Sequence, residues 1–134
     1  MNLKDEEREA LINYRLEQAR NTERVVDLLI ANNELSTAVN RIYYGMFYAL
    51  LALALKNKFE TSKHEQLIGW FNKNFIHAGK VDTKYGKTLS NAYKNRKKGD
   101  YDAFVSFELE DVKLMKSEMI EFIHEIEKAI ICEM

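Results

Sequence analysis

The sequence predicts an all-α protein, namely an up-and-down antiparallel four-helix bundle with one additional short helix. Three observations carry this prediction. The 134 residues include no proline and only five glycines, so little in the chain interrupts helices. Apolar residues, 46% of the chain, recur at helical spacing, and no segment shows the alternation of a strand. The connections between the expected helices are short, which favours antiparallel neighbours, so we expect residues 1–134 to form a single domain.

The first two expected helices cover residues 5–32 and 35–58. In the first, Asn32 and Asn33 supply the stop, and the apolar positions that share one face are Ile12, Leu16, Ala19, Val26 and Ile30. The second is almost continuously apolar, which predicts a core helix that is surrounded on most sides.

A polar spot interrupts this core helix. Arg41 is the single charge inside residues 35–55, and it stands beside Asn40 and a doublet of tyrosines, Tyr43 and Tyr44. Burying Arg or Asn costs free energy unless the side chain finds partners. The sequence therefore predicts that other helices bring polar groups to this spot.

Three further helices are expected. Ser62 and Glu65 have the spacing of a capping box, which predicts a third helix over residues 62–79. The fourth should cover residues 83–99. The fifth should follow Ser106, with acidic residues in its first turn, where the helix dipole favours them. Its apolar stripe consists of Leu109, Val112, Met115, Met119, Phe122, Ile126 and Ile130.

Charge is distributed unevenly, although the net charge is only −1. Residues 66–99 hold eight basic side chains and one acidic side chain, whereas residues 100–134 hold three basic and ten acidic ones. Two interpretations stay open. The basic and acidic segments could neutralise each other inside the fold, or the basic segment could face RNA or a nucleotide phosphate.

Common enzyme motifs are absent. The chain has no glycine-rich phosphate loop and no HExxH zinc pair, and its three histidines are dispersed. Glu121, His124 and Glu125 suggest half of a ferritin-like di-metal site, but the core helix offers no matching ligands. We therefore expect no metal and no cofactor. Cys132, the single cysteine, excludes an internal disulfide framework and lacks an obvious base for a catalytic thiol.

Signals for membranes, export and DNA recognition are also absent. Residues 1–9 are charged and lack the apolar core of a signal peptide. The apolar run over residues 42–55 is too short to span a bilayer. We expect a cytoplasmic protein without a membrane segment or a DNA-binding motif.

Three blocks of sequence occur in the order AVNRIYYGMFYALLAL, SKHEQLIGWFNKNFIHAGKV and NRKKGDYDAF. Together they resemble the HEPN superfamily, specifically its small stand-alone bacterial and archaeal branch, and the resemblance extends from Glu17 to Phe107. It implies a helical bundle that dimerises. It also implies a possible role in a toxin–antitoxin system, beside a minimal nucleotidyltransferase.

Active HEPN proteins resemble metal-independent ribonucleases, with an Arg followed four to six residues later by a His. Here Arg96 stands at the matching helix end, but Asp100 occupies a position where a His is sought, and no arginine of this chain has a histidine at that spacing. An ionised carboxylate cannot donate the proton that a histidine can. We therefore do not expect the standard ribonuclease chemistry.

We predict instead a surface that binds a nucleotide, RNA or a nucleotidyltransferase partner. Its candidate ligand-binding residues are Arg41, Tyr44, Lys63, His64, Arg96, Asp100 and Tyr101. The alternative is a ribonuclease toxin with a variant site, in which Arg96 stabilises the phosphorane and His64 acts as acid or base.

Structural interpretations of the same residues stay open. Arg96 and Asp100 have the spacing of a helix-end ion pair, and His64 can be a surface or capping residue. Arg41 could reach Asp100 or Asp102 and set the helix register. The two tyrosines can be core aromatics. In that case the protein would be a structural interaction module.

Overall fold

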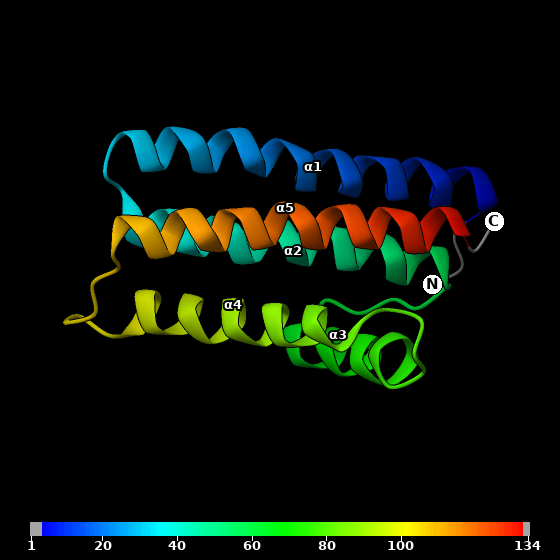
Figure 1. Ribbon diagram of the computed structural model, residues 1–134. Helices are drawn as coiled ribbons and strands as arrows, with labels where there is room; N and C mark the ends of the chain where they lie inside the picture. The colour runs from blue at the N-terminus through cyan, green and yellow to red at the C-terminus, as the bar shows by residue number, and fades with distance from the viewer. Residues whose placement is uncertain (1–3, 133–134) are drawn as a thin grey trace.

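The protein is an all-helical bundle, seen in a computed structural model that describes residues 4–132 (Figure 1). Its elements are α1 (Asp5–Ala31), α2 (Leu35–Lys56), α3 (His64–Phe71), the π-helical turn η1 (Asn72–Ile76), α4 (Thr83–Tyr101) and α5 (Leu109–Cys132). The four long helices alternate in direction, and α3 is the additional short helix. The predicted fold class is confirmed.

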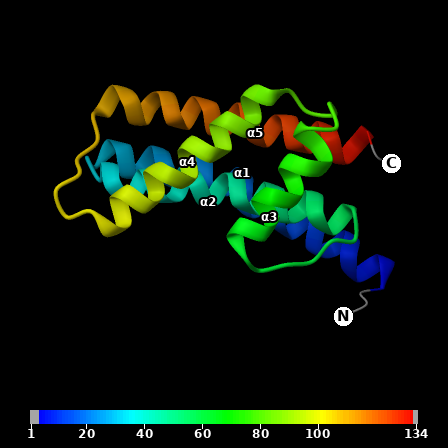
Figure 2. The same cartoon turned by 90° about the horizontal axis from the view of Figure 1, so that it is seen from below.

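Helix α2 lies at the centre of the bundle. It contacts each of the other helices, and α3 and α4 lie in front of it when the molecule is seen from below (Figure 2). Most of its residues are buried, including Tyr43, Leu50 and Leu53, which have no exposed surface. Helix α2 extends beyond the apolar run at residues 42–55, so by length and composition alone it could cross a membrane. Most of α2 is buried within the bundle, as in the core helix of a soluble protein.

Gly45 lets α2 approach its neighbours closely. A Cβ atom at this position would lie 2.9 Å from Sδ of Met119 on α5 and 3.0 Å from Cγ2 of Thr22 on α1. Packed interiors leave no room for an additional methyl group at such distances. Because Gly45 has no side chain, α1, α2 and α5 pack closely together here, one turn away from Arg41.

The third helix differs from its prediction. It begins at His64 rather than Ser62, and no side chain of the predicted capping box caps it. The Thr61 hydroxyl instead stabilises the turn before the helix. It accepts a hydrogen bond from the backbone N–H of Lys63 at 3.2 Å and donates to the Gln66 side chain at 2.7 Å. The α-helical part ends at Phe71, and η1 continues to Ile76. Gly79 follows with φ of 76°, a left-handed value that suits glycine.

The fourth helix continues past Gly99, where it was predicted to stop. Gly99 has no left-handed φ; a Cβ there would lie 3.1 Å from Oγ of Ser36 and 3.2 Å from the ring of Phe107. This glycine therefore permits close packing rather than ending a helix. The additional residues, Asp100 and Tyr101, carry α4 to the start of α2, where the candidate site lies.

The other predicted helix bounds agree closely with the structure. Helix α1 ends at Ala31, and Asn33 has a left-handed φ of 58°. The predicted apolar stripe of α5 is buried at Val112, Met119, Phe122, Ile126 and Ile130, whereas Leu109 at its start is 39% exposed. Residues 1–3 and 133–134 of the predicted domain lie outside the described residues.

Candidate functional site

Arg96 lies on α4 and is almost buried, with 13% of its side chain exposed. Its guanidinium carbon lies 5.1 Å from the ring centre of Tyr43, 5.7 Å from that of Tyr44 and 5.5 Å from that of Tyr93. Aromatic faces attract a cation most strongly when water is excluded. Three rings from α2 and α4 thus hold one positive charge at the boundary between these helices.

The hydrogen-bonding capacity of Arg96 is only partly used. Its Nη1 donates to the Tyr44 hydroxyl at 3.4 Å and lies 3.6 Å from Oδ2 of Asp100, one turn further along α4. Its Nε is buried and has no hydrogen-bond partner among the described residues. Such a group costs free energy in a packed interior, so this nitrogen is an unsatisfied buried donor.

Asp100 connects Arg96 with Arg41 through Asn40. The Asn40 amide nitrogen donates to both carboxylate oxygens of Asp100, at 3.2 and 3.3 Å. The Asn40 carbonyl oxygen in turn accepts from Nε and Nη2 of Arg41, at 3.0 and 2.8 Å. One interpretation left open by the sequence was that Arg41 reaches Asp100 or Asp102. In the structure Asn40 lies between Arg41 and Asp100 and hydrogen-bonds with both.

Tyr44 lies between the two cations. The guanidinium carbon of Arg41 is 4.6 Å from its ring centre, and Arg96 donates to its hydroxyl. The Tyr44 ring remains partly exposed, as do both arginines. Two cations and the single carboxylate of Asp100 leave this spot with a net charge of +1 when nearby histidine is neutral.

His64, the first residue of α3, completes the site. Its Nδ1 is hydrogen-bonded to the Tyr43 hydroxyl at 2.7 Å, and its ring stacks on Phe47 with 4.1 Å between ring centres. Burial and the positive charge of Arg96 lower the pKa of His64 below its ordinary value. Burial raises the pKa of the Tyr43 hydroxyl, which therefore stays protonated. At neutral pH His64 is thus uncharged and better suited to accept a proton than to donate one.

We call this set of side chains the Arg96 cluster; it consists of Asn40, Arg41, Tyr43, Tyr44, His64, Arg96 and Asp100. The structure brings together five of the seven predicted ligand-binding residues. The remaining two, Lys63 and Tyr101, stand next to His64 and Asp100 in the sequence. Within residues 4–132 neither side chain makes a hydrogen bond, ion pair or ring contact with the cluster, and Tyr101 is 80% exposed.

Two aromatic residues of the site were missed by the sequence analysis. Phe47 supports the His64 ring, and Tyr93 lies beneath Arg96 while its hydroxyl donates to Glu65 at 3.4 Å. A signal for both exists in the sequence. Phe47 follows Tyr43 by four residues and Tyr93 precedes Arg96 by three, spacings that put each pair on one face of a helix.

A metal site finds no support in the described part of the chain. In residues 4–132 no group of three His, Cys, Asp or Glu side chains is arranged to hold a metal ion. Glu121, His124 and Glu125 line an open groove of about 480 Å³ beside Tyr85 and Lys128, without further ligands from another helix. The Arg96 cluster contains a single carboxylate, which is already bonded to Asn40 and Arg96.

Comparison with known proteins identifies the family. Residues 12–129 match the HEPN domain, which covers most of the chain, and the protein therefore belongs to the HEPN family. The expected resemblance is confirmed.

Relatives of similar length support the same assignment. A protein named "UPF0332 protein" from Thermotoga maritima is 40% identical over 92% of this chain and 94% of the relative. Two proteins of Methanocaldococcus jannaschii are each 32% identical: "Putative toxin MJ0142", over 70% of this chain and 64% of the relative, and "Putative toxin MJ0605", over 77% and 76%.

Proposed function

We propose that this HEPN-family protein is a toxin-like protein that binds RNA, with the Arg96 cluster as the phosphate-binding site. The observation that carries the proposal is the largely buried Arg96 guanidinium, whose Nε lacks a partner among the described residues while its Nη1 faces Tyr44 and Asp100. The two Methanocaldococcus relatives named as toxins support the toxin-like role.

The chemistry of the cluster suits a phosphate next to a base. A guanidinium offers several N–H groups in a fixed fork, which matches phosphate oxygens better than a lysine does. Arg41 and Arg96 both lie near the partly exposed Tyr44 ring, and bases of single-stranded RNA stack on exposed aromatic rings. Neither interaction needs a metal ion.

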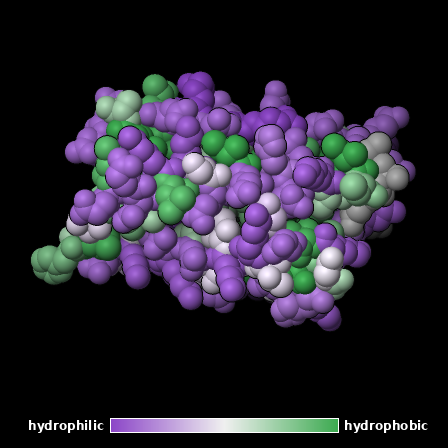
Figure 3. All heavy atoms as spheres, in the orientation of Figure 1, coloured by the Kyte–Doolittle hydropathy of each residue, from purple (hydrophilic) through white to green (hydrophobic). Residues whose placement is uncertain are grey.

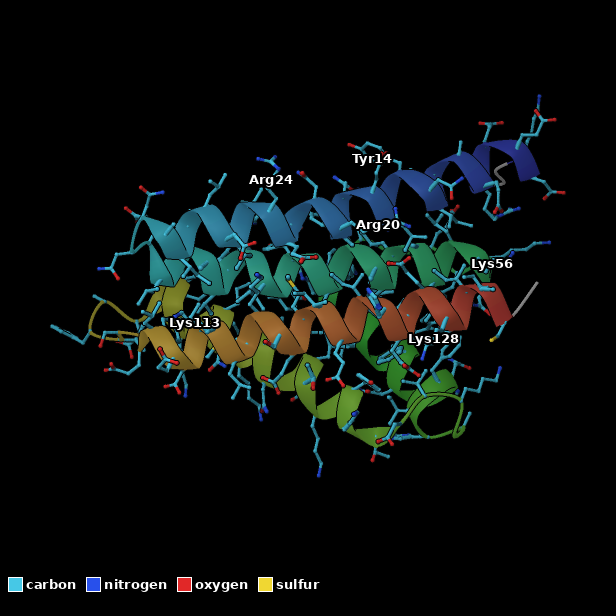
Figure 4. The ribbon with its side chains drawn as sticks, turned by 45° about the horizontal axis from the view of Figure 1, so that its top comes forward. Tyr14, Arg20, Arg24, Lys56, Lys113 and Lys128 are labelled. Atoms are coloured by element: carbon cyan, nitrogen blue, oxygen red, sulfur yellow. The ribbon has the colours of Figure 1, made fainter. Side chains whose placement is uncertain are left out.

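The proposal is tested by binding of a fluorescein-labelled 12-nucleotide single-stranded RNA, followed by fluorescence anisotropy. We expect Arg41→Gln and Arg96→Gln each to weaken binding at least tenfold. Arg24→Gln is the matched control, because Arg24 points away from the bundle in Figure 4 and only donates to Asn21. Equal binding by all three variants and the wild type, with circular dichroism showing intact folds, would refute the site.

A second candidate function, metal-independent RNA cleavage, is favoured by one specific observation: the His64 ring is held by a hydrogen bond with Tyr43, where burial and Arg96 lower the pKa of the imidazole. As a base it would take the proton of a ribose 2′-hydroxyl. The 2′-oxygen would then attack the adjacent phosphorus and the 5′-oxygen would leave, taking a proton from water, while Arg96 stabilises the phosphorane.

Cleavage is tested with labelled RNA in the presence of EDTA. His64→Gln should abolish it, whereas His77→Gln, a change at an exposed histidine outside the cluster, should leave the rate unchanged. Persistence of cleavage in His64→Gln would exclude this histidine as the base.

The expected partners are part of the same proposal. The resemblance to HEPN proteins suggests a homodimer in the cytoplasm and a minimal nucleotidyltransferase as antitoxin. Sedimentation of the purified chain, alone and with a nucleotidyltransferase encoded beside it, tests both: a single species with the mass of one chain under all conditions would contradict them.

A further inference from the structure

Helix α4 presents an exposed row of lysines on the side that faces away from the bundle. Lys87, Lys94 and Lys98 are seven and four residues apart, which places them on one face of the helix, and all three are exposed. We call these three residues the α4 lysine face. The surface over α4 is mostly hydrophilic in Figure 3.

These charges are not neutralised by the rest of the fold. Among the described residues, Lys84–Glu121 at 3.4 Å is the ion pair that joins α4 to α5, and no ion pair involves the α4 lysine face. The other long-range ion pairs of α5 connect it with α1, namely Arg20–Glu127 and Asp27–Lys116. Asp82, the one acidic residue among residues 66–99, caps the start of α4 by accepting from the backbone N–H of Lys84 at 2.9 Å. Mutual neutralisation of the basic and acidic segments, one of the two interpretations left open by the sequence, therefore does not explain the lysine row.

Lys97 connects the α4 lysine face with the Arg96 cluster around the helix, since Lys94 and Lys98 are each two residues from Arg96 and lie on the other side of α4. Lys97 stands next to Lys98, and its Nζ lies 4.7 Å from the ring centre of Tyr93, the ring that also lies beneath Arg96. One aromatic side chain thus contacts a cation of the surface and the cation of the buried site. An anion bound along α4 would reach the cluster without crossing a carboxylate of this helix other than Asp100.

We infer that the α4 lysine face is a track for the phosphate backbone of single-stranded RNA and guides the strand into the Arg96 cluster. The inference rests on the proposed function of that cluster. From Lys87 to Lys98 the helix rises about 16 Å, a length that suits a few nucleotides of single strand. Lys94 and Lys98 also line a groove whose α5 side carries Asp111 and Glu118. Because these carboxylates repel phosphate, the inferred track uses the outer side of α4 and not the groove.

The division of labour between the two sites has a physical basis. Exposed lysines attract any polyanion by counterion release, which is sensitive to salt and insensitive to sequence. The oriented guanidinium groups of the cluster supply defined hydrogen bonds. The track therefore contributes most of the salt dependence of binding, and the cluster contributes the contacts of one nucleotide.

The test uses the triple variant Lys87→Gln, Lys94→Gln, Lys98→Gln. Its matched control removes three lysines elsewhere, at Lys56, Lys113 and Lys128, which Figure 4 places on α2 and α5. With the same labelled RNA, we expect the track variant to bind at least tenfold more weakly at low salt. Its plot of log affinity against log salt should be shallower by about 2, since each lost phosphate contact on a single strand removes about 0.7. The control variant should change neither value substantially.

The outcomes separate this inference from the proposed function. If Arg96→Gln abolishes RNA binding but the track variant binds RNA as tightly as the control variant does, the track is wrong and the proposed function stands. Absence of RNA binding by the wild type would overturn both. If poly-L-glutamate binds the wild type more tightly than RNA does, the surface fits an acidic protein. This outcome also overturns the RNA track. Equal affinity for the DNA strand of the same sequence would assign the track to single strands in general rather than to RNA.

Discussion

Arg96 and the α4 lysine face are positive charges on the same helix, but Arg96 is largely buried with fixed contacts, whereas the lysines are exposed. In the cluster a guanidinium is surrounded by three aromatic rings, and its neighbours are fixed by hydrogen bonds across α2 and α4. On the lysine face each ammonium group is exposed and has no carboxylate partner among the described residues. A buried cation therefore contributes to both folding and orientation, whereas an exposed one contributes to attraction over a distance that salt can screen.

The largest effect is expected at the buried member of this comparison. Arg96→Ala removes the contacts with three rings and with Tyr44 and Asp100, and we expect the free energy of unfolding to fall by about 2 kcal/mol. Urea denaturation measures this. Arg24→Ala, at an exposed position of α1, should change stability by less than about 0.5 kcal/mol. Similar values for the two variants would show that the ring contacts do not stabilise the fold.

Asp100→Asn sharpens the comparison by separating charge from shape. The amide keeps an oxygen that can accept from Asn40 but loses the negative charge beside Arg96, so we expect a loss of about 1 kcal/mol in stability. The net charge of the cluster rises by one. RNA should therefore bind several-fold more tightly although the protein is less stable. Weaker binding in this variant would mean that Asp100 itself contacts the ligand.

A smaller effect is expected from pH, through His64. Because burial and Arg96 lower its pKa in the folded protein below the ordinary value of 6.5, the unfolded chain binds a proton more readily than the folded one. The contribution of neutral His64 to stability is therefore complete above pH 6.5 and is lost as the pH falls below that value. Denaturation curves at pH 7.5 and 5.5 should show a smaller loss in His64→Gln than in the wild type. An identical loss in both would assign the pH dependence to other groups.

The smallest effect on stability belongs to the lysine face. Replacing Lys87, Lys94 and Lys98 with Gln removes three charges, yet we expect the melting temperature to stay within about 2 °C of the wild type, because exposed lysines without partners contribute little to folding. Differential scanning calorimetry measures this. A clear decrease would place these lysines in contacts that stabilise α4.

The helical periodicity was sufficient to predict the bundle and its central helix, because apolar side chains at 3.6-residue spacing leave few alternatives. Local signals were less reliable. The spacing of Ser62 and Glu65 predicted a cap that the Thr61 hydroxyl provides instead, and Gly99 suggested a helix end where it actually permits close packing. Both errors arise because the same residue type can serve a local turn or a tertiary contact.

The candidate site also combines residues that the sequence predicted well with residues that it predicted poorly. A polar spot in a buried helix requires partners, so the sequence predicted that other helices bring polar groups to Arg41 and Tyr44, and the resemblance to HEPN proteins added His64, Arg96 and Asp100. Lys63 and Tyr101 stand next to His64 and Asp100 in the sequence, and within residues 4–132 their side chains form no hydrogen bond, ion pair or ring contact with the cluster. Sequence position fixes where a backbone passes but not where a surface side chain points.

By itself, then, the sequence determined the helical class, the order of the helices, the family and the unequal distribution of charge, because these follow from composition, periodicity and motif spacing. Only the tertiary structure decided that Asn40 links Arg41 to Asp100 and that three rings surround Arg96. It also decided that, among residues 4–132, Lys84 of α4 has a carboxylate partner whereas the α4 lysine face has none. Each of these facts depends on distances between side chains of different helices, and packing sets those distances.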